Sequence, residues 1–60
     1  PDMLTTQQAK RLLQDMGYQA KSHVGFISVM QEYNVKGKKK GRGYVWMRAD
    51  IINNIPNRAA

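Results

Sequence analysis

The sequence predicts a small α+β domain made of two helices, a basic two-stranded β-hairpin and a short third helix. Two stretches in the first half of the chain repeat apolar residues at helical spacing. Between Val35 and Trp46 the chain is apolar at both ends, and the seven residues 36–42 hold five cations and two glycines. Because glycines allow a tight turn, we interpret this segment as two short strands joined by a basic loop.

Composition indicates a single small domain. Sixty residues without a cysteine exclude disulfides and thiolate metal sites, and His23 has no partners for a zinc site, so we expect no metal and no cofactor. A hydrophobic content of 42% suffices for one compact core, which we place in residues 4–55, with flexible ends at 1–3 and 56–60. No transmembrane run or signal peptide is visible. We therefore expect a soluble, cytoplasmic protein.

The first helix is predicted from about Thr6 to Met16. Thr5 can cap its start, and Gln8 stands at the reciprocal position of a capping box. Gly17 is suited to the position just after the helix. One apolar stripe follows the helical period, formed by Ala9, Leu12, Leu13 and Met16.

The second helix is predicted to begin after Ser22, a good N-cap, and to end near Tyr33 or Asn34. One broad arc is apolar and contains Phe26, Ile27, Val29, Met30 and Tyr33, and His23 falls toward it. The opposite arc carries mostly small or polar residues, namely Lys21, Val24, Gly25, Ser28, Gln31 and Glu32. This arc is either an ordinary outer surface or a face that approaches base-pair edges, where Val24 would meet a thymine methyl group. A glycine inside a helix costs about 1 kcal/mol relative to alanine, so Gly25 indicates a close approach.

Positive charge is concentrated in the hairpin. Ten Lys and Arg residues against four Asp and Glu residues give a net charge of +6, and half of the cations lie between Lys36 and Arg42. Five positive charges on a short hairpin repel one another and stabilise no fold, so their expected partner is a polyanion such as a phosphate backbone. In the returning strand, Trp46 is expected to anchor the core rather than to stack on bases.

The third helix is predicted to start in the segment Arg48-Ala49-Asp50-Ile51-Ile52. Asp50 is expected to cap this helix or to lie in its first turn. Pro56 ends it, because proline cannot continue a helix.

Four segments resemble those of MerR-type and excisionase-like DNA-binding domains. The opening helix of these domains is similar to Leu4-Thr5-Thr6-Gln7-Gln8-Ala9-Lys10-Arg11-Leu12-Leu13. Tyr33-Asn34-Val35 resembles their exit from the second helix. Gly41-Arg42-Gly43-Tyr44-Val45-Trp46 resembles their wing, and Arg48-Ala49-Asp50-Ile51 their closing segment.

The resemblance implies a winged helix-turn-helix that binds double-stranded DNA, as a phage or mobile-element regulator or an excisionase-like factor. Such a protein would be associated with the nucleoid. Helix 22–33 would lie in the major groove and wing 36–43 on the backbone or in the minor groove. Backbone N–H groups at the start of the first helix would meet phosphate. The predicted DNA-binding residues are Thr5, Thr6, Lys10, Lys21, Ser22, Val24, Gly25, Ser28, Gln31, Lys36, Lys38, Lys39, Lys40 and Arg42.

Two other classes of function remain open at this stage. The same cations suit an RNA- or ribosome-binding protein, and the basic wing suits a module that docks on an acidic protein partner. Further partners under the main hypothesis are a second copy of the chain, through cooperative binding, or a recombinase or polymerase. An enzyme is not expected, because the sequence contains no nucleophilic triad, carboxylate pair, metal cluster or phosphate-loop motif.

Overall fold

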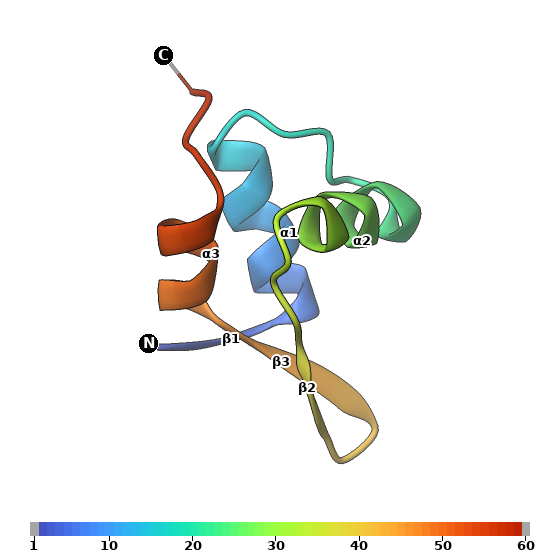
Figure 1. The fold of residues 1–60 in the computed structure, drawn as a ribbon. Helices are drawn as coiled ribbons and strands as arrows, with labels where there is room; N and C mark the ends of the chain where they lie inside the picture. Colours follow the sequence, from blue (N-terminus) through green and yellow to red (C-terminus); the bar gives the residue numbers. More distant parts are fainter. Residues whose placement is uncertain (1, 60) are drawn as a thin grey trace.

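The computed structural model describes residues 2–59 as a small α+β fold with three helices and a three-stranded antiparallel sheet (Figure 1). Pro1 and Ala60, expected to belong to flexible ends, lie outside these residues. None of the helices in the described part of the chain has the length and apolar character needed to span a membrane. In chain order the elements are β1 (Met3–Thr5), α1 (Thr6–Asp15), α2 (His23–Glu32), β2 (Lys38–Lys40), β3 (Gly43–Met47) and α3 (Arg48–Asn54).

The local signals at both ends of α1 are confirmed. The hydroxyl of Thr5 accepts from the Gln8 backbone N–H at 3.2 Å, and the Gln8 side-chain oxygen accepts from the Thr5 N–H at 3.0 Å. This reciprocal capping box satisfies donors that the helix itself cannot. The helix ends at Asp15, one residue before the predicted end, and Gly17 adopts a φ of 94°.

Helix α2 also begins where its cap predicts. The Ser22 hydroxyl accepts from the Gly25 N–H at 3.0 Å, and the helix ends at Glu32, just before the predicted limit. Asn34 then turns the chain with a φ of 61°, a conformation that asparagine tolerates better than most residues. The Val35 N–H donates to the Met30 carbonyl at 2.8 Å, and this bond closes the helix end.

The sheet differs from the predicted hairpin in two respects. Its order is β1-β3-β2, and the edge strand β1 was not predicted. Residues 38–40 were expected in the loop but form strand β2, in which Lys39 pairs with Tyr44 and Lys40 with Gly43. The loop is therefore only Gly41 and Arg42. A positive φ of 62° at Gly41 is the feature that a two-residue hairpin turn requires at its first position.

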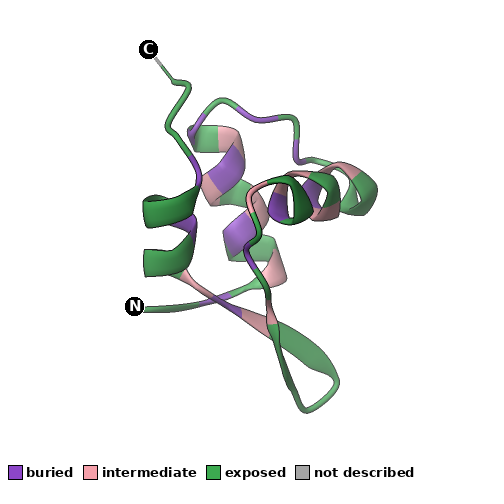
Figure 2. Cartoon of the chain, in the orientation of Figure 1, coloured by how far each residue is buried: buried purple, intermediate pink, exposed green. Residues whose placement is uncertain are grey.

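The core lies between the helices and the inner face of the sheet. Figure 2 shows buried segments on α1 and α2 where they face the interior, and an exposed hairpin below them. Trp46 is only 5% exposed, and its indole N–H donates to the Thr6 hydroxyl at 3.1 Å. Its expected role as a core anchor is confirmed. The other buried apolar residues are Leu4, Ala9, Leu13, Met16, Tyr18, Ala20, Phe26, Met30, Val35, Ile51 and Ile55.

The segments expected to be flexible ends make defined contacts in their described parts. Met3 pairs with Met47 in the sheet. The Tyr18 hydroxyl donates to the Pro56 carbonyl at 2.6 Å, and the Arg58 N–H donates to the Met16 carbonyl at 2.8 Å. The folded unit therefore extends beyond 4–55 at both ends.

Two further details concern the start of α3 and the side chain of Tyr33. Helix α3 starts without a side-chain cap, and Asp50 lies in its first turn. The Tyr18 and Tyr33 rings meet edge-on at 6.0 Å, and the neighbouring Tyr18 hydroxyl, followed by desolvation, raises the pKa of Tyr33 above its ordinary value of 10.0.

Candidate nucleic-acid interface

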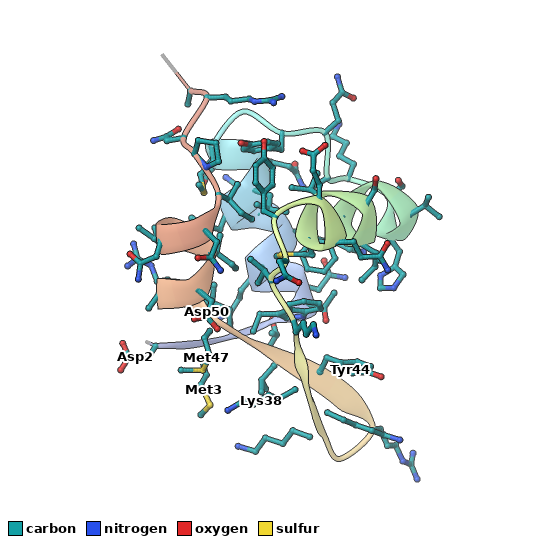
Figure 3. The ribbon with its side chains drawn as sticks, in the orientation of Figure 1. Asp2, Met3, Lys38, Tyr44, Met47 and Asp50 are labelled. Carbon is teal, nitrogen blue, oxygen red and sulfur yellow. The ribbon has the colours of Figure 1, made fainter. Side chains whose placement is uncertain are left out.

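The two faces of the sheet divide the hairpin cations. Side chains alternate between the faces of a strand, and directly paired residues share a face. From the register, Lys39 and Tyr44 lie on the inner face with Trp46, whereas Lys38 and Lys40 lie on the outer face. Figure 3 shows Tyr44 and Lys38 on opposite sides of the hairpin. The cations that the sequence grouped as one wing surface therefore belong to two surfaces.

A row of aromatic rings connects the inner face of the hairpin with the start of α2. The Tyr44 ring centroid lies 6.5 Å from that of Trp46, and Trp46 meets Phe26 edge-on at 5.0 Å. Phe26 in turn lies 6.3 Å from the imidazole of His23. Phe26 and Trp46 are buried, whereas Tyr44 and His23 are exposed at the two ends of the row. The row thus fixes the hairpin relative to α2 and carries surface side chains at both ends.

The outward face of α2 is exposed, as the sequence predicted. Val24 has 80% of its surface exposed, and the side chains one and two turns further along, Ser28 and Gln31, are also exposed. A shallow hollow of about 390 Å³ runs over this face and is lined by His23, Val24, Ile27, Ser28 and Gln31. Lys21 and Ser22 are exposed just before the helix. This face offers small apolar and neutral polar groups, with the cation Lys21 just before the helix and the acidic Glu32 at its end.

The structure gives Gly25 a role different from the predicted one. A Cβ atom at this position would lie 2.7 Å from the backbone oxygen of Gln19 and 3.2 Å from the Ser22 hydroxyl. The close approach that its glycine indicated is therefore made to the protein's own backbone. The Ser22 hydroxyl is likewise engaged, because it caps α2.

At the start of α1, the two predicted threonine hydroxyls already have partners. Thr5 caps the helix through Gln8, and the half-buried Thr6 accepts the indole N–H of Trp46. Lys10 is half-buried on the same helix. The two threonines serve the fold first, and nothing in the geometry of the three residues singles them out for a phosphate.

The hairpin cations have no acidic partners within residues 2–59. The single ion pair in this part of the chain joins Arg11 Nε to Asp15 Oδ1 at 3.5 Å, and both side chains are largely exposed on α1. Lys36, Lys38, Lys39, Lys40 and Arg42 are all exposed. Their charge is therefore available to an external anion.

Two residues of the candidate interface were not identified from the sequence. Tyr44 is 53% exposed on the inner face beside Lys39, and Ile27 lines the hollow on α2. The alternation of Tyr44, Val45 and Trp46 on one strand was a signal that Tyr44 shares the face of Trp46. It could not show that Tyr44 lies beyond the edge of the core.

Comparison of the chain with protein-family models, with curated proteins and with solved structures found no match. The resemblance to MerR-type and excisionase-like domains is therefore a prediction from the sequence segments alone.

Proposed function

We propose that the protein binds double-stranded DNA as a winged helix-turn-helix domain. The observation that carries the proposal is the aromatic row from His23 to Tyr44, which joins the exposed face of α2 to the inner face of a basic hairpin. A helix beside a cationic hairpin suits a duplex, because the helix enters the major groove while the hairpin follows the neighbouring backbone or minor groove.

Helix α2 supplies the groups that would meet base edges. Val24 offers a methyl surface to thymine, and Gln31 offers an amide that can pair with adenine. Ser28 lies between them and can donate or accept a hydrogen bond. Lys21, at the start of the helix, is positioned for phosphate. A helix with so few strong base readers gives modest sequence preference.

The hairpin supplies most of the affinity in this proposal. Lys39 on the inner face and Arg42 in the turn would contact phosphates, and each neutralised phosphate contributes about 0.9 to the slope of log affinity against log salt. Lys38 and Lys40 would contribute less, because their positions lie on the other face. Binding of this kind suits a small phage or mobile-element regulator or an excisionase-like factor that acts at repeated sites.

Titration of ¹⁵N-labelled protein with duplex DNA tests the proposal directly. The amide signals of His23–Gln31 and Lys38–Tyr44 should shift, while those of α3 should change little. Matched titrations with duplex RNA and single-stranded RNA address the alternative that an exposed Tyr44 beside Lys39 stacks on single-stranded bases. Tighter binding of either RNA than of duplex DNA at equal salt would identify RNA as the ligand. Unchanged signals in both segments would refute nucleic-acid binding by this surface.

A further inference from the structure

The outer face of the sheet carries an apolar surface that no element of residues 2–59 covers. All three helices lie on the other side of the sheet (Figure 1). Met3 pairs with Met47, and Thr5 pairs with Val45, so these four side chains share the outer face. Met3 is 49% exposed, and Met47 and Val45 are half-buried. We call these four residues the outer patch. Clustered apolar side chains on a surface commonly mark a protein contact, and methionine adapts well to such contacts.

Charge is distributed unevenly along this face. At the α3 end, Asp2 precedes Met3, and Asp50 follows Met47 in the first turn of α3. Arg48, the exposed first residue of α3, lies between Met47 and Asp50 at the same end. At the hairpin end, Lys38 pairs with Val45, and Lys40 follows it on the same face. Figure 3 shows Asp2 and Asp50 around the methionines and Lys38 beyond them. Two acidic residues against one cation leave the α3 end acidic, so the order along the sheet is acidic, apolar, basic. Two of the four acidic residues of the chain stand at one end of the outer patch.

We infer that the outer patch binds a second copy of this chain in a two-fold symmetric dimer. A two-fold axis perpendicular to the strands would place the two sheets face to face with antiparallel strands. The methionines and valines of the two copies would then pack together at the centre. Lys38 of each copy would meet Asp2 and Asp50 of the other, and these contacts would form twice.

The charge pattern favours a second copy of the chain as the partner of the outer patch, and it favours the antiparallel orientation. An axis parallel to the strands would set like charges opposite one another, which is unfavourable. A face that is acidic at one end and basic at the other is complementary to itself when reversed. The hairpin's inner face, with Lys39 and Tyr44, and the exposed face of α2 stay open in such a dimer. The inference is independent of DNA binding, because it concerns the opposite face of the sheet.

Sedimentation equilibrium without DNA, from micromolar to millimolar protein, tests the dimer. The wild-type chain should associate to a dimer. Lys38→Glu should weaken association by about tenfold, because the reversed charge repels the acids of the other copy at both contacts. Lys39→Glu makes the same charge change on the inner face and should leave association as it is. Asp2→Lys/Asp50→Lys should weaken association to a similar extent.

Mixing provides the sharpest test. An equimolar mixture of the Lys38→Glu chain and the Asp2→Lys/Asp50→Lys chain should recover wild-type affinity, because both contacts of the mixed dimer again join opposite charges. Met3→Ser is a second probe that leaves charge unchanged. It should weaken association by about tenfold or more, since the lost apolar area counts twice in a two-fold interface. Circular dichroism confirms that each variant is folded.

Three results would overturn the inference. The wild-type chain could remain monomeric at millimolar concentration, which would assign the outer patch to a different protein or leave it without a partner. A dimer that is indifferent to both Lys38→Glu and Met3→Ser would use another surface. Failure of the mixture to recover affinity would rule out the antiparallel arrangement.

Discussion

The backbone oxygen of Gln19 lies so close to Gly25 that a Cβ atom on residue 25 would stand 2.7 Å from it. Gln19 belongs to the turn between the first two helices, and Gly25 lies in the first turn of α2. Their contact, together with the Ser22 cap, sets the path by which the chain enters α2. The angle at which α2 presents its outward face therefore depends on a glycine that faces the protein itself.

Replacing Gly25 by alanine should destabilise the fold despite alanine's better helix propensity. The propensity gain is about 1 kcal/mol, but a contact of 2.7 Å with backbone cannot be relieved by a side-chain rotation. We expect a net loss of about 1–2 kcal/mol in the free energy of unfolding, as for other overpacked sites. Urea unfolding followed by Trp46 fluorescence measures this free energy. Gly43→Ala is the matched control, because a Cβ there meets nothing within 4 Å. Equal midpoints for Gly25→Ala and wild type would contradict the proposed contact.

The hydrogen bond between Thr6 and Trp46 should contribute measurably to stability. Thr6→Val keeps the shape of the side chain but leaves the indole N–H of a buried tryptophan without its acceptor. The expected loss is about 1 kcal/mol of unfolding free energy. Thr6→Ser retains the hydroxyl and should recover most of the lost unfolding free energy. If the serine variant were no more stable than the valine variant, the hydroxyl would not be the group that matters.

The helices could be predicted from the sequence because their signals are local. Thr5, Gln8 and Ser22 act on N–H groups three residues away, and Gly17 turns the chain directly after α1. Their positions fix the helix boundaries to within one or two residues.

The sheet was harder to predict because its signals are distant in sequence. Strand β1 has only three residues and exists through its pairing with β3, near the other end of the chain. Lysine has low strand propensity, so residues 38–40 were expected in a loop, and only their pairing with β3 makes them a strand. Similarly, Gly25 was expected to approach a base-pair edge, and the sequence could not show that the backbone oxygen of Gln19 is its close neighbour.

The two faces of the hairpin should differ in their effect on DNA binding. Lys39→Ala should lower the slope of log affinity against log salt by about 0.9, the value for one phosphate contact. Lys38→Ala removes the same charge from the outer face and should change the slope by much less. Fluorescence anisotropy with a labelled duplex at several salt concentrations measures both. The comparison must use protein concentrations at which the wild type is monomeric. Equal slopes for the two variants would show that DNA does not distinguish the faces of the hairpin.

Val24 should contact the methyl group of thymine if α2 lies in the major groove. Its side chain is 80% exposed, so Val24→Ala should leave the unfolding free energy nearly unchanged. Replacing thymine by deoxyuridine removes only the 5-methyl group from the major groove, and burying one such group contributes about 0.8 kcal/mol. The wild-type protein should therefore bind a thymine-containing site roughly fourfold more tightly than its deoxyuridine counterpart, as this free energy implies.

Combining Val24→Ala with the replacement of thymine by deoxyuridine distinguishes a direct contact from a general loss of affinity. Val24→Ala should bind the two duplexes equally, because the partner of the methyl group is gone. Ile52→Ala, which shortens an exposed apolar side chain on α3, should keep the wild-type preference for thymine. A preference that survives Val24→Ala would place another residue at the methyl group. Absence of any preference in the wild type would mean that α2 does not contact thymine in the major groove.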